Sequence, residues 1–388
     1  MRAVGEGRLK NDSGAFERHI DRCLGCRACE QVCPAGVEYG QLLEAARGEL
    51  FTDGPPRGFS YGVLRLLLKH VWLHPGRLKF FFSATRLFRN SGLPRVLLKS
   101  GLPGLVSRRM EFGLALLASS SRALEGKSRD VPPYSPDTVN PAMMFNGCVG
   151  EGLFKRINEA TARVLKANGF TVGVPERQVC CGALHAHAGD LEGARTLAKR
   201  NIEAFQAGAA VPIITNAGGC GAMLVSYAHL LEHDEQFAER ARSFSGRVRD
   251  VSQHLETTDL KSGAPVSDQP VTYDASCHLL YGQHAGQAPL NMLTGVPDLN
   301  FVKLEGSERC CGGAGIYNLL EPELSRRVLD EKLGNIKNSG AQVLATGNAG
   351  CQMQIGAGAL LSGINLKVCH PIELLDQAYE QAGFYKEL

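Results

Sequence analysis

The sequence predicts an α/β protein with two duplicated domains, each built on a mostly parallel sheet, and a helical segment in front of them. The first observation is a pattern that occurs twice: a lone Cys, then Cys-Cys-Gly, then another Cys. The second is that short apolar runs alternate with helical stretches in both copies, which is typical of parallel sheets covered by helices. The third is spacing, because 31 and 38 residues separate the cysteine positions in the first copy, against 32 and 39 in the second.

The cysteines of the two copies are candidate metal ligands. They are Cys148, Cys180, Cys181 and Cys220 in the first copy, and Cys277, Cys310, Cys311 and Cys351 in the second. Four thiolates suit either a 4Fe–4S cluster or a tetrahedral zinc ion, so we expect one such centre in each domain. Buried core thiols are the alternative, but adjacent side chains in extended backbone cannot both face inward. Gly182 and Gly312 are expected to let the backbone approach a bulky inorganic group.

Each copy is expected to form a parallel sheet with its cysteines at one edge. The expected strands are 142–145, 170–174, 211–215 and 247–251 in the first copy, and 271–273, 299–304, 342–346 and 365–368 in the second. We expect long helices at 190–207 and 322–339. Ligands collect beyond the carboxyl ends of parallel strands, where the cysteines fall, and helix N-termini there favour negative charge.

The N-terminal part carries a different cysteine motif. Residues 12–22 are expected to be helical and lead into Cys23-Leu-Gly-Cys26-Arg-Ala-Cys29-Glu-Gln-Val-Cys33-Pro34. This run is typical of bacterial ferredoxins, in which three closely spaced thiolates wrap one 4Fe–4S cluster and the fourth serves a second cluster. A zinc knuckle is the alternative. Because only one such run is present, either Cys33 closes its own cluster, or a missing N-terminal segment or another subunit supplies the other ligands of the centre that it serves.

Composition limits the class of protein. Thirteen cysteines, an odd number, without a secretory signal favour metal thiolates in a reducing compartment, and we expect a cytoplasmic location. No run of 18 apolar residues occurs, so no transmembrane segment is expected. Gly312-Gly-Ala-Gly315 follows a Cys pair and has Asn318 where a third spaced Gly would stand, so it does not fit a dinucleotide-binding fingerprint.

Charge is segregated along the chain. From Arg57 to Arg109 there are eleven Lys or Arg and no Asp or Glu, which leaves 31 basic and 39 acidic residues elsewhere, a net charge of −8. Apolar spacing predicts helices around 64–71, 78–88 and 105–117 in this stretch. There are three interpretations of this basic stretch. Its helices pack on the rest of the protein with a solvated basic edge, or they dock to an acidic partner subunit, or they dock to anionic lipid headgroups. Nucleic acid is not an expected partner, because no binding motif accompanies the charge.

These observations divide the chain into a ferredoxin-type segment at 1–54, a basic helical connector at 55–125, a proline-rich linker at 126–141, and two cysteine-bearing domains at 142–256 and 268–388. Cys369, the thirteenth cysteine, is expected to be a buried thiol near the second site, at the position of Asp250 in the first copy. Four histidines near cysteines are expected to cap or pack, with hydrogen bonding to a cluster as the alternative: His185, His187, His278 and His370.

The motifs resemble those of a known family. The two repeats are similar to the CCG domains of heterodisulfide reductase, anaerobic glycerol-3-phosphate dehydrogenase and lactate-utilisation subunits. The resemblance is closer to the iron–sulfur subunit of glycolate oxidase (glycolate dehydrogenase), and it runs through nearly the whole chain. It rests on Asp21-Arg-Cys-Leu-Gly-Cys-Arg-Ala-Cys-Glu30, Cys180-Cys-Gly-Ala-Leu-His185, Cys310-Cys-Gly-Gly-Ala-Gly-Ile-Tyr-Asn318, Thr346-Gly-Asn-Ala-Gly-Cys351 and His370-Pro-Ile-Glu-Leu-Leu375.

The resemblance implies Rossmann-like CCG domains in a subunit that relays electrons and carries no catalytic residue of its own. A separate subunit containing FAD would oxidise glycolate to glyoxylate, and the electrons would pass toward quinone at the cytoplasmic face of the membrane. The family has two ferredoxin runs where this sequence has one, so the chain is expected to begin after the first. Heterodisulfide reductase has a further Cys where Ala217 and Asn348 stand here, so a noncubane cluster is not expected.

Two other functions remain open from the sequence. One is a self-contained thiol or disulfide reductase that uses a cluster at a Cys-Cys-Gly site. The other is a zinc-stabilised scaffold subunit without a redox role. The identity of the 2-hydroxy acid is not visible in this chain, because its oxidation needs a hydride acceptor that we expect on the partner.

Overall fold

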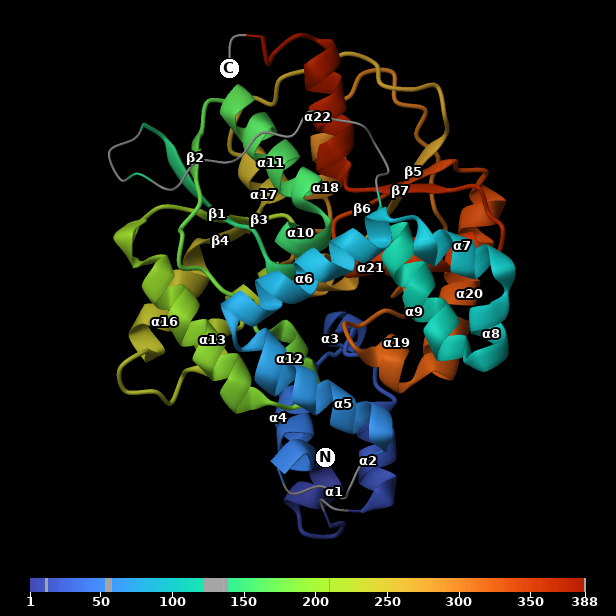
Figure 1. The fold of residues 1–388 in the computed structure, drawn as a ribbon. Helices are drawn as coiled ribbons and strands as arrows, with labels where there is room; N and C mark the ends of the chain where they lie inside the picture. The colour runs from blue at the N-terminus through green and yellow to red at the C-terminus, as the bar shows by residue number, and fades with distance from the viewer. Residues whose placement is uncertain (11–12, 53–57, 122–134, 136–138, 209, 387–388) are drawn as a thin grey trace.

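The computed structural model describes residues 1–388 apart from 11–12, 53–57, 122–134, 136–138, 209 and 387–388. Two α/β domains lie side by side, helices α5 to α9 cross their front, and helices α1, α2 and α4 lie at one end (Figure 1). The predicted fold class is confirmed, because both sheets are parallel and covered by helices. Most of the expected linker at 126–141 lies outside the described residues.

The first domain contains a four-stranded parallel sheet in the order β2-β1-β3-β4. Its two central strands are almost completely buried because every inward and outward position is apolar or small, as expected for a sheet covered on both faces. The strands are β1 (Pro141–Phe145), β2 (Thr171–Gly173), β3 (Ile213–Thr215) and β4 (Val248–Asp250). The helices are α10 (Cys148–Leu153), α11 (Lys155–Ala167), α12 (Ala183–Ala188), α13 (Leu191–Ala204), α14 (Gly218–Val225), α15 (Tyr227–Leu230), α16 (Ala238–Arg247) and α17 (Val251–Leu255).

The second domain repeats this arrangement with one strand fewer. Its sheet has the order β5-β6-β7, with β5 (Val271–Asp274), β6 (Val343–Thr346) and β7 (Lys367–Cys369). The strand expected at 299–304 is reduced to one parallel bridge between Val271 and Phe301, in which the N–H of Val271 bonds to the carbonyl of Asn300 and the N–H of Val302 to the carbonyl of Val271. The helices are η3 (His278–Gly282), α18 (Ala288–Leu293), α19 (Tyr317–Leu320), α20 (Pro322–Ser339), α21 (Ala349–Leu361) and α22 (Pro371–Gln381).

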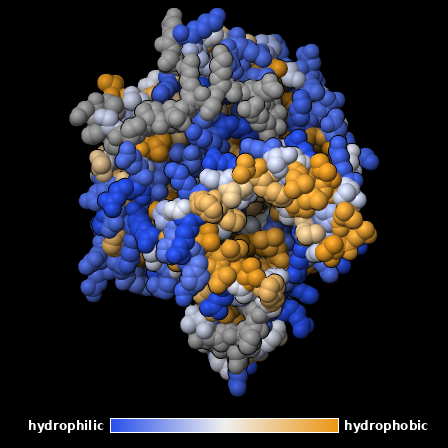
Figure 2. Space-filling view, in the orientation of Figure 1, coloured by the Kyte–Doolittle hydropathy of each residue, from blue (hydrophilic) through white to orange (hydrophobic). Residues whose placement is uncertain are grey.

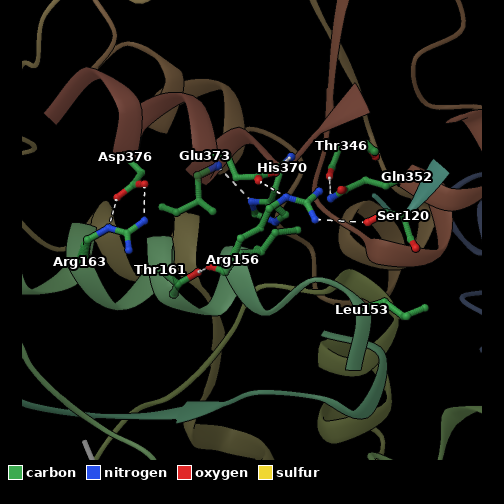
Figure 3. A network of polar contacts seen from close by, with 12 residues as sticks. Ser120, Leu153, Arg156, Thr161, Arg163, Thr346, Gln352, His370, Glu373 and Asp376 are labelled. Atoms are coloured by element: carbon green, nitrogen blue, oxygen red, sulfur yellow. Dashed lines mark hydrogen bonds and ion pairs between the residues drawn. The ribbon is translucent and has the colours of Figure 1, made fainter. Parts of the chain in front are cut away.

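The two domains contact each other through equivalent pairs of helices. Helix α11 of the first packs on α22 of the second, and α18 of the second packs on α17 of the first. Arg163 holds Asp376 through two hydrogen bonds of 2.8 and 2.7 Å, and Arg156 lies 2.7 Å from Glu373 (Figure 3). These ion pairs are largely shielded from water, so each depends on its partner. The interface fixes how the carboxyl edges of the two sheets meet.

The N-terminal segment forms a small helical unit with its own core. Its helices are α1 (Arg2–Gly5), α2 (Gly14–Asp21), α3 (Ala28–Gln31) and α4 (Tyr39–Thr52). Phe16 and Ile20 of α2 pack against Leu43 and Leu50 of α4. The hydroxyl of Tyr317 donates to the carbonyl of Arg22 over 2.9 Å, which ties this unit to the second domain.

The basic connector is a chain of short helices that bridges both domains. The helices are α5 (Phe59–Leu67), the π-helical turn η1 (Leu68–Trp72), α6 (Pro75–Asn90), α7 (Leu93–Ser100), α8 (Leu102–Val106) and α9 (Arg108–Ser119). Helix α6 packs on α10 and α9 packs on α21. Helix α7 was not expected, because Gly92 and Pro94 indicate a break; instead Gly92 caps the helix with φ 77° and Pro94 lies in its first turn.

Candidate metal–thiolate site

All eight cysteines of the two repeats line one cavity of about 350 Å³ between the domains. The sequence predicts two separate sites, whereas the structure places both sets of thiols around a common space. The loops that carry the two last cysteines touch, since the N–H of Gly218 donates to the carbonyl of Gly347 over 2.9 Å. Leu64, Leu67 and Trp72 of the connector complete the cavity wall.

In the first domain the cysteines follow the strands that flank the switch in strand order. Cys148 begins α10 after β1, and Cys220 lies in the first turn of α14 after β3. Their sulfurs lie 3.4 Å from that of Cys180 and 3.5 Å from that of Cys181, respectively. Because Cys180 and Cys181 are adjacent, the four thiols form two close pairs joined through one peptide bond.

The second domain has the same arrangement. The Sγ atoms of Cys277 and Cys310 lie 4.0 Å apart, and those of Cys311 and Cys351 lie 3.3 Å apart. Four thiols are suitable donors for a cluster or for a zinc ion. Within the described ranges, no three or more His, Cys, Asp or Glu converge as they do around a single metal ion.

The backbone conformation after each Cys pair requires glycine. Gly182 and Gly312 adopt φ of 90° and 83°, a backbone conformation that favours glycine. A Cβ on Gly312 would lie 2.6 Å from the carbonyl oxygen of Ser325 in α20, and a Cβ on Gly182 would lie 3.4 Å from the backbone of Ala194 in α13. At Gly312 the missing side chain therefore gives room to α20, whereas at Gly182 the positive φ is the structural reason for glycine. The expected approach to an inorganic group stays a prediction.

Burial and neighbouring thiols decide which sulfur of the second set ionises first. Hydrogen bonds from Cys277 and Cys311 hold the pKa of Cys310 well below its usual value, and the N–H of Gly312 donates to the same sulfur over 3.4 Å. The bond to Cys310 and burial raise the pKa of Cys277, and bonds to Cys310 and Cys351 with burial raise that of Cys311. Cys310 is therefore the favoured thiolate.

Polar side chains that the sequence analysis did not single out hold the two Cys pairs. In the first domain the Asn201 side chain donates to the carbonyl of Cys180 over 3.0 Å, and the Tyr227 hydroxyl donates to that of Cys181 over 2.7 Å. In the second, Lys332 pairs with Asp274 at 2.7 Å, both at most 2% exposed, and donates to the carbonyl of Gly306 just before the pair. In the sequence, Asn201, Tyr227 and Lys332 could have been found as polar residues at helix positions that face the core.

Asn348 contacts one thiol of the second set and the backbone beside Cys220 of the first set. Its side-chain nitrogen lies 3.3 Å from the sulfur of Cys351, to which it donates, and its oxygen accepts from the N–H of Gly219 over 3.3 Å. From the sequence, position 348 was notable only because it lacks a cysteine. The structure makes it a link between the loops of Cys220 and Cys351.

The ferredoxin-type run lies beside the second set of thiols. Cys23, Cys26 and Cys33 are partly buried and Cys29 is exposed. Backbone N–H groups of Val37 and Ala35 lower the pKa of Cys33, which suits a thiolate ligand. Burial raises the pKa of Cys26, with the nearby charge of Cys310 contributing, and α3 contacts η3.

The histidines differ in what they contact. His185 bonds to Asp190 at 2.7 Å, and His370 caps α22, as expected for packing and capping residues. His187 and His278 form a ring pair with centroids 5.4 Å apart, and Nδ1 of His278 lies 3.5 Å from the sulfur of Cys277. His278 is therefore the one of these four histidines with a recorded contact to a ligand candidate.

Cys369 is buried in β7, as expected, but its counterpart in the first domain is not Asp250. Asp250 caps α17 with a capping box, and His370 caps α22 in the same way. Asp250 therefore corresponds to His370, and Arg249 corresponds to Cys369.

Two parallel α/β domains that bring eight thiols to a shared cavity define a protein of the cysteine-rich domain class. The family described as "Cysteine-rich domain" matches residues 142–225 and 271–356, one match in each domain. A protein named "Probable glycolate oxidase iron-sulfur subunit" from Bacillus subtilis (strain 168) is 37% identical over 388 residues, which cover 99% of this chain and 86% of that protein.

Other relatives agree with this class. The "Glycolate oxidase iron-sulfur subunit" of Escherichia coli (strain K12) is 30% identical over 94% of this chain and 83% of its own length. "Lactate utilization protein A" of Exiguobacterium sp. (strain ATCC BAA-1283 / AT1b) is 32% identical over 62% of this chain and 98% of its own. The chain belongs to the family of glycolate oxidase iron–sulfur subunits, and the resemblance stated from its motifs is confirmed.

Proposed function

We propose that this chain is the electron-transfer iron–sulfur subunit of a flavin-dependent glycolate (2-hydroxyacid) dehydrogenase. The observation that carries the proposal is that three sets of thiols lie in sequence: the ferredoxin-type run, then the second set beside it, then the first set across the shared cavity. Iron–sulfur clusters at such sites would supply one-electron transfer. The names of the relatives support iron and sulfide as the cofactor.

Each part of the chain has a role in this function. Cys23, Cys26, Cys29 and Cys33 would hold a 4Fe–4S cluster, and the four cysteines of each domain would hold a further 4Fe–4S cluster or zinc. The connector and the α11–α22 ion pairs fix the distances between the sites, and the apolar cavity wall of Leu64 and Trp72 keeps water from the thiolates. The Asn348 amide donates to a sulfur of the second set, and the Lys332 ammonium offsets the buried Asp274 carboxylate of the same domain.

The hydride chemistry belongs to a partner. The glycine-rich residues 310–318 do not match a dinucleotide-binding fingerprint. They form the loop of the second Cys pair and line the thiol cavity. We therefore place FAD on a partner subunit and expect quinone as the final acceptor, with the chain in the cytoplasm at the inner face of the membrane. Among helices in the described ranges, none is both long and apolar enough to cross a bilayer.

The two alternatives remain distinguishable. A thiol or disulfide reductase would act without a flavoprotein, and a zinc scaffold would be colourless. The test is anaerobic purification with iron, sulfide and zinc analysis, followed by glycolate-dependent dye reduction with and without the flavin subunit. We expect brown protein, and dye reduction only in the presence of the flavoprotein.

Substitutions test the ligand assignment. Cys181→Ser should remove the iron of the first domain while the electron paramagnetic resonance signal of the ferredoxin-type run persists. Cys369→Ser is the matched control, because this thiol is buried in the apolar core of β7 and should leave the iron content unchanged. Equal iron loss in both variants, or zinc alone in the wild type, would refute the proposed function.

A further inference from the structure

The connector carries an unusual share of the exposed apolar side chains. Thirteen of the twenty large apolar side chains that are exposed among the described residues fall between Phe59 and Met110. The most exposed are Phe59 at 88%, Leu105 at 84% and Val106 at 76%. Figure 2 shows apolar side chains gathered on the face where α5 and α7 to α9 lie. Soluble domains rarely expose apolar groups in such a concentration without a binding role.

Helix α8 shows the pattern most clearly. Of its five residues, Leu102, Leu105 and Val106 are 58%, 84% and 76% exposed, while Pro103 is buried. A surface helix normally turns its apolar side to its own core. Helix α8 presents most of its apolar side chains to solvent.

Cations surround these apolar side chains. Arg95 and Lys99 of α7 and Arg108 and Arg109 of α9 are exposed on either side of α8. No Asp or Glu occurs between residues 57 and 109, so acidic side chains of this stretch do not offset the charge. Exposed Leu and Phe among Lys and Arg are typical of segments that lie at a bilayer interface, where acyl chains take the apolar groups and anionic headgroups attract the cations.

We propose that the exposed residues of α5 to α9, the connector surface, dock on an anionic lipid bilayer with α8 at the level of the headgroups. The proposal rests on the proposed function, because it supplies the route by which a lipid-soluble acceptor reaches the chain. Helix α5 has both roles in its sequence: Leu64 and Leu67 line the thiol cavity, while Phe59 and Leu66 are exposed. One helix thus separates the thiols from the membrane.

The test is flotation of the full-length, anaerobically purified chain with vesicles. We expect binding to phosphatidylcholine vesicles that contain phosphatidylglycerol, little binding to phosphatidylcholine alone, and release at high salt. Leu105→Asp should reduce binding at least tenfold. Leu360→Asp is the matched control, because Leu360 is 49% exposed on α21, outside the connector surface, and should bind as the wild type does. Lys99→Gln and Arg108→Gln should each reduce binding about fivefold.

Three results would overturn the proposal. One is equal flotation of wild type and Leu105→Asp, and another is wild-type protein that stays unbound although its iron content is complete. The third is a Leu105→Asp protein that floats normally but no longer copurifies with the flavin subunit, which would make the surface a subunit interface. Dye reduction with the flavoprotein, measured without vesicles, tests the proposed function separately. A chain that relays electrons but ignores vesicles would refute only the docking.

Discussion

The side-chain oxygen of Asn348 accepts a hydrogen bond from the backbone N–H of Gly219, 3.3 Å away, and so joins the loops of the two repeats. The nitrogen of the same amide lies 3.3 Å from the sulfur of Cys351. The Asn348 side chain therefore connects the sulfur of Cys351 in the second thiol set to the loop that carries Cys220.

Asn348→Ala should lower the reduction potential of the centre in the second domain, because a donor to a ligand sulfur stabilises the reduced, more negative form. Potentiometric titration followed by electron paramagnetic resonance measures the effect. Ala217 occupies the equivalent position in the first repeat, so Ala217→Asn is the reciprocal variant and should raise the potential of the first centre. An unchanged potential in Asn348→Ala would mean that this amide does not act on the centre.

Gly312→Ala should destabilise the chain more than Gly182→Ala. Both positions have positive φ, which costs a non-glycine residue about 1–2 kcal/mol. Only Gly312 adds a severe overlap, since its Cβ would lie 2.6 Å from the carbonyl of Ser325, against 3.4 Å from Ala194 for Gly182. Guanidinium unfolding of both variants measures the difference, and equal midpoints would contradict it.

Lys332→Met should destabilise the second domain by about 3–5 kcal/mol, because it leaves Asp274 buried without its cation. Burial already raises the pKa of Asp274 against the effect of Lys332, so loss of the lysine should raise it further. The double variant Lys332→Met with Asp274→Asn should recover most of the loss. Arg326→Met, which breaks an exposed pair with Asp330, is the control and should change stability by less than about 1 kcal/mol. No recovery in the double variant would show that the ion pair is not the cause.

Helices and strands were predictable from the sequence where particular residues mark both ends of the element. Helix α20 was expected at 322–339 and spans Pro322–Ser339, because Pro322 suits a first turn and Gly340, at φ 72°, suits a helix end. The strand expected at 299–304 is only a single bridge, because apolar content alone does not show how many residues pair with the neighbouring strand. The overlap with Ser325 that Gly312 avoids was also not predictable, because it depends on how α20 packs.

The common cavity was not predictable from either repeat alone. It depends on contacts such as Arg163 with Asp376, which are 213 residues apart, and on the meeting of Gly218 with Gly347. The cysteine spacing indicates which thiols gather within a domain, because they follow neighbouring strands. It contains no information on how the two edges face each other.

His370→Asn should flatten the dependence of stability on pH below neutrality. Burial lowers the pKa of His370 to about 3, while the unfolded chain has the ordinary value of about 6.5. Since the folded pKa is the lower one, the unfolded state binds the proton first, and stability is lost as the pH falls from about 6.5 toward 3.

Because the unfolded histidine is already half protonated at pH 6.5, this amounts to about 1.6 kcal/mol between pH 6.5 and pH 5. Asn keeps a side chain able to cap α22 but cannot titrate, so the variant should lose about that much less stability over this interval. His233, whose side chain is 94% exposed, provides the control, and His233→Asn should follow the wild type. Guanidinium unfolding midpoints at the two pH values measure this difference. If the midpoint changed equally with pH in His370→Asn and in the wild type, His370 would take up its proton equally well in the folded and the unfolded chain.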